Sequence, residues 1–364
     1  MSDVVQQGNR APVAWRAWTV IALTLVFGAL LEAAVQLRFE LRHGTSMVEL
    51  MRQRSLFETD PATGLKRLHP QGEFVRQQQV ITSNALGLRG PEPGLDAARP
   101  RVIVLGASTV MGAAASDDAH TLPARLEAAL RERLGLPVQV VNGGISGYTL
   151  ADQRELLETV LKPVPAGLVV LYPGFNDFAP YCQAPAWRRP AAMQGLPRLA
   201  MPEWWMTDDL VLANTSALRE APPALLPARD PDRMDLSAYR AAAEALARSA
   251  ARQGRTLLIA TVARSFRREQ DGAEQARRAA ELAALLPCFS TAGLHRLFER
   301  HNEVLAQVAR RHGLPLVDLA QLVPGEARYF ANATRLTDAG SEFAARQLAA
   351  AIAGARLLGS AEDH

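Results

Sequence analysis

The chain has 364 residues, enough to bury one large core or two smaller ones, and its 48% apolar and 21% charged residues are ordinary for a globular protein. The net charge is only +3, and no long basic run occurs although arginine greatly outnumbers lysine. The charge distribution therefore gives no support for nucleic-acid binding. The sequence also contains no pattern for a metal or a cofactor.

The N-terminal segment is apolar. Residues 17–31 carry no charge before Glu32 interrupts the run. A signal anchor, a cleaved signal peptide and a buried core helix all fit this pattern, because a full span needs about 20 mostly apolar residues. The lack of a small-x-small cleavage site favours the anchor. We therefore predict a cytoplasmic tail over residues 1–16, a transmembrane helix over 17–37, and a main domain outside the cytoplasm, in the periplasm.

A connecting region follows, over residues 38–100. Asp60-Pro-Ala-Thr-Gly64 has the composition of a turn, and Phe74–Ser83 is rich in residues that favour a strand. Three prolines from residue 91 to residue 100 argue against a helix there. We expect a small β-rich lead-in that packs on the main domain.

From Arg101 onward, apolar strand patterns alternate with helical patterns, which predicts a parallel sheet with helices on both faces. This main domain is expected over residues 101–354, followed by a C-terminal tail over 355–364. The expected strands are 102–105, 138–141, 168–172, 256–261 and 315–319, and the expected helices are 121–134, 150–161, 236–253, 272–286, 294–312 and 338–353.

Residues 178–234 break this alternation. The segment is too long for an ordinary connection and holds many prolines with Tyr181, Trp187, Trp204 and Trp205. We expect an insertion over the edge of the active site, either a lid or substrate-binding surface or simply a packed surface loop. Two alternatives also remain for Cys182 and Cys288, which form either one disulfide in an oxidising compartment or two unpaired thiols.

Glycine-rich polar turns follow three of the expected strands. They are Gly106-Ala-Ser108, Asn142-Gly-Gly144 and Gly174-Phe-Asn-Asp177. Parallel strands bring such turns to one edge of the sheet, where ligands bind. A hydroxyl with several N–H donors is what acyl transfer requires. Ser108 taken alone would favour a cap on the next helix, but the ordered set of turns favours a nucleophile.

These blocks resemble those of the SGNH (GDSL-like) hydrolase superfamily. The first block is Gly106-Ala-Ser-Thr109, with alanine where many members have aspartate, the second is Asn142-Gly-Gly-Ile-Ser-Gly147, and the third is a full Gly-x-Asn-Asp match at Gly174–Asp177. Asn84–Gly90 also resembles the segment that precedes this domain in many extracytoplasmic members.

The resemblance implies a flavodoxin-like three-layer α/β/α sandwich with a parallel sheet of about five strands. It also implies that Ser108 is the nucleophile, with an oxyanion hole made by the N–H groups of Ser108 and Gly144 and by the side chain of Asn176. The implied activity is hydrolysis or transfer of O-acyl groups on a carbohydrate or a lipid.

The fourth block departs from the superfamily pattern of Asp-x-x-His before the last helix. Leu336-Thr-Asp-Ala-Gly340 fixes the register, so the two catalytic positions fall on Asn332 and Arg335. Arginine stays protonated and has no acceptor, so it cannot take the serine proton. We expect structural or surface roles for the other candidate bases, which are His120, His295, His301 and His312.

Three blocks match the superfamily and the fourth does not, so two functions are possible. The first is an extracytoplasmic esterase or acyltransferase that uses Ser108 with another base. The second is a catalytically inactive protein of the same fold that binds an anionic glycan or a partner through Arg335 and the oxyanion-hole donors.

Overall fold

The computed structural model describes residues 13–43, 56–76, 79–96, 99–182 and 228–358. The chain divides into two compact units, residues 1–55 with 187–222 and residues 56–186 with 223–364. In the first unit the described part is helix α1 (Val13–His43). Within it, Trp18–Arg38 has a mean hydropathy of 2.1 over a length that could cross a membrane. This apolar helix is consistent with a signal sequence or an anchor.

The second unit is built on a five-stranded sheet in the order β6-β5-β7-β8-β9, with every neighbouring pair parallel. This confirms the predicted fold class. The strands are β5 (Arg101–Gly106), β6 (Gln139–Gly144), β7 (Leu168–Tyr172), β8 (Thr256–Ala260) and β9 (Leu316–Val317).

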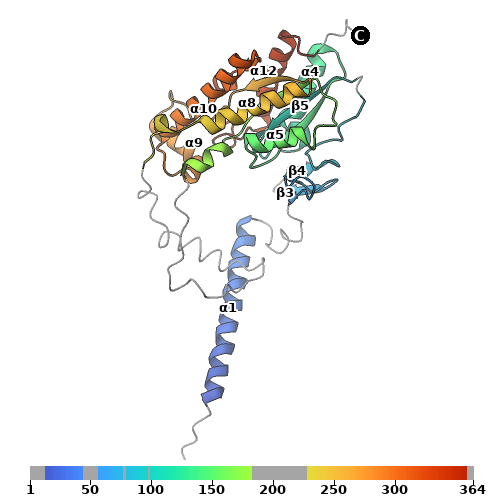
Figure 1. Cartoon of the computed structure of the whole chain (residues 1–364). Coiled ribbons are helices and arrows are strands. Elements are labelled where there is room, and N and C mark those ends of the chain that lie inside the picture. The colour runs from blue at the N-terminus through green and yellow to red at the C-terminus, as the bar shows by residue number, and fades with distance from the viewer. Residues whose placement is uncertain (1–12, 44–55, 77–78, 97–98, 183–227, 359–364) are drawn as a thin grey trace, which may run out of the picture. The chain divides into compact units, whose positions relative to one another are not determined.

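Helices cover both faces of this sheet because both faces of its strands are apolar. In β5, Ile103 and Leu105 face one core, and Val102 and Val104 face the other. Figure 1 shows the layers. The first core is closed by α5 (Leu150–Glu158), α8 (Ser237–Arg252) and α10 (Thr291–His312), and the second by α4 (Leu122–Leu134) and α12 (Asp338–Gly354).

Short elements complete the unit. A third apolar cluster joins α9 (Gly272–Leu285) to α10 and to the 3₁₀ segment η2 (Asn176–Cys182). The remaining short helical elements are α3 (Ser108–Met111), η1 (Asp118–His120), η5 (Pro231–Arg233) and α11 (Leu319–Leu322). The last strand is shorter than predicted because the Asp318 side chain accepts the Gln321 N–H as the N-cap of α11.

Two antiparallel hairpins form the lead-in. The predicted turn at residues 60–64 joins β1 (Phe57–Thr59) to β2 (Lys66–Leu68). The single strand predicted over Phe74–Ser83 is wrong, because β3 (Glu73–Arg76) and β4 (Gln79–Thr82) pair with each other there.

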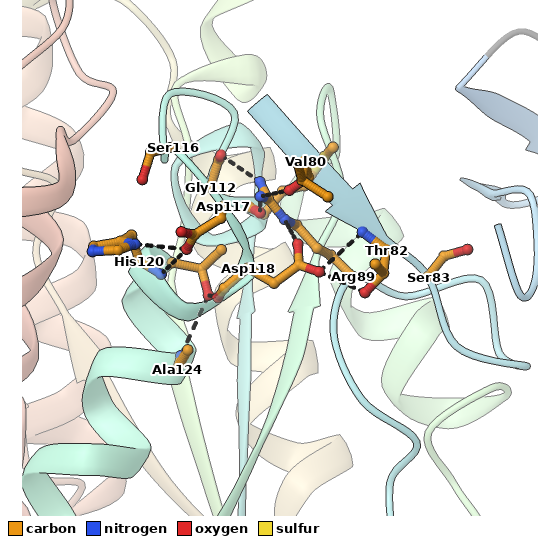
Figure 2. A network of polar contacts seen from close by, with 12 residues as sticks. Val80, Thr82, Ser83, Arg89, Gly112, Ser116, Asp117, Asp118, His120 and Ala124 are labelled. Carbon is orange, nitrogen blue, oxygen red and sulfur yellow. Dashed lines mark hydrogen bonds and ion pairs between the residues drawn. The ribbon is translucent and has the colours of Figure 1, made fainter. Parts of the chain in front are cut away.

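The buried side chain of Arg89 fastens this lead-in to the loop that follows α3 (Figure 2). Its Nε donates to Asp118 Oδ1 at 2.6 Å, its Nη1 to the Gly112 carbonyl at 2.7 Å and its Nη2 to the Val80 carbonyl at 3.1 Å. The other Asp118 oxygen accepts both the N–H and the hydroxyl of Thr82. A buried guanidinium requires such partners, so the lead-in and the main domain share one polar network.

Cys182 and Cys288 form a disulfide with a Cα–Cα distance of 5.5 Å, which decides between the two alternatives for these residues. The bond joins the end of η2 to the segment between α9 and α10. Most of the predicted insertion, residues 183–227 with Trp187, Trp204 and Trp205, lies outside the described residues, as do residues 359–364 of the predicted tail.

Candidate active site

The site lies at the point where the strand order reverses. From β5 the chain passes first to β6 on one side and later to β7 on the other. Open α/β sheets bind ligands at such a switch point, beyond the carboxyl ends of the strands. Ser108 follows β5 and Asn176 follows β7, so both residues lie at this edge of the sheet.

Ser108 is the first residue of the four-residue helix α3. The N-cap of α3 is Ala107, which makes no side-chain cap, and the N-cap of α4 is Thr121. Ser108 therefore caps neither helix. It is partly exposed, and within the described residues its hydroxyl makes no hydrogen bond. The hydroxyl is available for chemistry, and so is the Ser108 N–H, because the first N–H groups of a helix have no partner inside it.

The three predicted turns come together around α3. A Cβ on Gly144 would lie 2.2 Å from the Met111 nitrogen, and one on Gly174 would lie 2.6 Å from the Ala107 Cβ. Only glycine allows these approaches. The Asn176 Nδ2 donates to the Tyr148 carbonyl at 2.8 Å, which ties the third turn to the second and leaves one N–H of the amide for a ligand.

The predicted donor at Gly144 is already engaged. Its N–H donates to Asn142 Oδ1 at 3.0 Å, and the residue is buried. An Asn that accepts from the N–H two residues later forms an Asx turn, which the Asn142-Gly-Gly sequence could have indicated. Gly147 is exposed and has a φ of +91°, and its N–H makes no hydrogen bond within the described residues. Sequence reasoning missed this glycine.

Asp177 braces the same edge. Its two carboxylate oxygens accept the Leu150 N–H at 3.2 and 3.3 Å, at the start of α5. Burial raises the pKa of Asp177 to about 6, because it disfavours the charged form, and the hydrogen bond from Leu150 opposes this only in part.

The fourth block forms a clasp with helix α9. Asn332 Nδ2 donates to Glu281 Oε2 at 2.7 Å, and Arg335 Nη1 lies 3.7 Å from Glu281 Oε1. We call these three residues the Glu281 clasp. The Arg335 side chain is 41% exposed. Among the described residues, it forms an ion pair with Glu281. The loop still touches helix α3, since the Thr109 hydroxyl donates to the Thr334 carbonyl at 3.3 Å.

No histidine in the described part of the chain hydrogen-bonds to Ser108. His120 pairs with Asp117 at 2.6 Å, and His312 lies in the last turn of α10. His295 and His301 are buried, and burial lowers the pKa of each imidazole to about 4. The described residues also contain no cluster of three or more His, Cys, Asp or Glu side chains that could hold a metal ion.

The fold and these turns define an α/β protein of the SGNH hydrolase type. The sequence profile of the GDSL-like Lipase/Acylhydrolase family matches residues 104–343, and the chain belongs to this family. No curated protein sequence matches the chain.

The chain is also similar to solved structures of low sequence identity. LAE5, an alpha/beta hydrolase enzyme from the metagenome of Lake Arreo, Spain, is 18% identical, with 71% of this chain and 97% of that chain covered and a TM-score of 0.42. The lipase/acylhydrolase from Enterococcus faecalis is 15% identical, with coverages of 70% and 96% and a TM-score of 0.42. Axe2, an acetylxylan esterase from Geobacillus stearothermophilus, is 16% identical, with coverages of 70% and 94% and a TM-score of 0.41.

Proposed function

We propose that this protein is an extracytoplasmic O-acyl hydrolase or acyltransferase that acts on an acylated carbohydrate or lipid, with Ser108 as the nucleophile. The observation that carries the proposal is the Ser108 hydroxyl. It caps no helix, has no hydrogen-bond partner within the described residues, and belongs to the turn on which the Gly144 and Gly174 turns pack.

In the proposed reaction the Ser108 oxygen loses its proton to solvent hydroxide and attacks the ester carbonyl, whose oxygen becomes an oxyanion. The intermediate then expels the alcohol, which takes a proton from water, and water or an acceptor hydroxyl removes the acyl group from Ser108. The donors for this oxyanion are the Ser108 N–H, the remaining N–H of Asn176 and the exposed Gly147 N–H, which takes the role first expected of Gly144. Fixed donors of this kind stabilise charge without reorganisation, and each one typically contributes about 10²–10³ in rate.

The serine proton has no side-chain acceptor within the described residues. Arg335 cannot accept it, and the Glu281 carboxylate is held in the clasp with Asn332. Loss of the catalytic base typically lowers the rate by about 10⁴, so slow turnover that depends on solvent hydroxide is expected. The rate should therefore rise steadily with pH instead of levelling off at the pKa of a histidine.

The second candidate function, an inactive protein that binds anions through Arg335, has less support. The guanidinium pairs with Glu281 on α9, and an anionic ligand would have to compete with that carboxylate. The proposed compartment rests on other features. A disulfide is typical of proteins outside the cytoplasm, and α1 is long and apolar enough to serve as an anchor.

Covalent labelling tests the proposed nucleophile. The full chain in detergent is incubated with a fluorophosphonate, alongside Ser108→Ala and, as a matched control, Ser146→Ala in the neighbouring turn. We expect label on the wild type and on Ser146→Ala, at a slow rate that rises with pH because Ser108 has no base, but none on Ser108→Ala. We also expect hydrolysis of 4-nitrophenyl acetate to rise with pH between about 6 and 9 without a plateau. The absence of both labelling and turnover would reject the proposal.

A further inference from the structure

Lys66 lies beside the Gly147 turn, although it comes from the lead-in. The chain has only two lysines, Lys66 and Lys162. The Lys66 Nζ is 3.0 Å from the position that a Cβ on Gly147 would occupy. The Tyr148 hydroxyl donates to the Lys66 carbonyl at 2.5 Å, so strand β2 is fastened to this turn. The ammonium group thus lies next to an exposed part of the candidate active site.

The charge of Lys66 is not neutralised by an ion pair within the described residues. The carboxylate that affects it electrostatically is Asp152, which already accepts from the N–H and the hydroxyl of Thr149 at the start of α5. The Nζ also lies 4.8 Å from the centroid of the Phe57 ring. Burial lowers the pKa of Lys66, because it disfavours the charged form, and Asp152 opposes this effect.

We propose that Lys66 binds an anionic group, a carboxylate or a phosphate, on the acylated substrate whose ester is held at Ser108. This inference rests on the proposed function and names the class of substrate. A partly buried ammonium without a bound carboxylate gains more from an incoming anion than an exposed and already paired cation does. Lys66 meets this condition and Arg335 does not, since Arg335 is paired with Glu281.

Kinetics with two matched esters test the specificity. The full chain in detergent is compared with Lys66→Met, Lys66→Arg and the control Lys162→Met, on neutral 4-nitrophenyl acetate and on anionic 4-nitrophenyl hemisuccinate. Lys66→Met should lower kcat/KM for the anionic ester by about tenfold and for the neutral ester by less than about twofold. Lys66→Arg should retain most of the preference, and Lys162→Met all of it. Equal losses on both esters, or no loss on either, would overturn the inference.

A binding measurement separates this inference from the proposed reaction. In the Ser108→Ala chain with ¹³Cε-labelled lysine, only two lysine signals occur, and Lys162 provides the internal control. The ligands are trigalacturonic acid, glycerol 3-phosphate and neutral xylotriose. A shift of the Lys66 signal with the first ligand identifies a carboxylate, and a shift with the second identifies a phosphate.

Either shift supports the inference when xylotriose causes none. No shift with either anion, or an equal shift with xylotriose, overturns it. If no ester is hydrolysed while an anion still shifts the Lys66 signal, the proposed reaction fails and the anion site stands.

Discussion

The two sides of the candidate site differ in what holds them together. On one side, the turns after β5, β6 and β7 touch through backbone atoms and glycines, as where Gly144 meets the Met111 nitrogen. On the other side, the fourth block is held to α9 by the Glu281 clasp, through exposed polar side chains. The first side holds the donors that we propose for the oxyanion. On the second side, Asn332 and Arg335 stand where the superfamily pattern has its aspartate and histidine.

We infer from this difference that the two sides of the proposed catalytic site can change independently of each other. A side chain at Gly144 would collide with the backbone of α3, so packing in the fold requires glycine at this position on the first side. Exposed ion pairs typically contribute less than about 1 kcal/mol, so the residues of the clasp can change at little cost to stability. A chain can therefore keep the donors after losing the base.

The largest expected effect comes from rebuilding the second side. Asn332→Asp with Arg335→His restores the family pair, but Asp at position 332 would face the Glu281 carboxylate, because the present amide lies 2.7 Å from it. Adding Glu281→Ala removes this repulsion. The triple variant should hydrolyse 4-nitrophenyl acetate about 10³-fold faster than the wild type, with a new pH plateau from the imidazole.

The double variant that retains Glu281 is the control, and its gain should be smaller. If the triple variant folds and still shows no gain, the first side of the site is not competent, and the contrast between the two sides is wrong.

A pair of glycine substitutions sharpens the account of the first side. Gly144→Ala should lower the free energy of unfolding by about 3 kcal/mol, since its Cβ would overlap backbone atoms of α3. Gly147→Ala should cost only about 1 kcal/mol. Its Cβ would meet only the far end of the long Lys66 side chain, but a φ of +91° is strained for alanine.

The effect on activity should have the opposite order. Gly147→Ala should lower kcat by more than its small loss of stability explains. Denaturant unfolding and ester kinetics on the same samples check both statements. Alanine keeps the N–H, so the loss of kcat would come from a backbone that leaves the φ of +91° and turns this donor away from the oxyanion. A Gly147→Ala variant with full kcat would contradict this account of the strained turn.

The smallest effect concerns Asp177, which braces the first side. Its pKa in the folded state, about 6, lies above the ordinary value of 3.8, so the folded chain holds a proton that the unfolded chain releases. The stability from this group is present at low pH and is lost as pH rises through about 6. Asp177→Asn stays neutral and can still accept from Leu150, so it should melt several degrees higher at pH 8 and at the wild-type temperature at pH 4. A variant that is less stable at pH 8 would contradict this reasoning.

Local patterns in the sequence predicted the sheet well. Apolar runs such as Leu168–Tyr172 need no distant information, and the ordered glycine turns located the edge where Ser108 and Asn176 meet. The β3–β4 hairpin was missed because no glycine, asparagine or proline marks a turn between Arg76 and Gln79.

The remaining features of the site depend on pairs that are distant in the sequence. Glu281 is 51 residues from Asn332 in the sequence. Lys66 reaches the Gly147 turn from the β1–β2 hairpin. No periodicity or motif in a single sequence specifies such pairs.

The hydrogen bonds of Arg89 limit how far the chain can be truncated from its N-terminal side. A shortened chain that begins at Arg101, where the alternating strands and helices start, would lose Arg89 and leave the Met111 and Gly112 carbonyls and the Asp118 carboxylate without their guanidinium. It would also lose Lys66 from the rim of the Gly147 turn. The smallest autonomous unit should therefore start no later than Leu56, and the proposed anion site at Lys66 lies outside the residues 104–343 that the family profile matches.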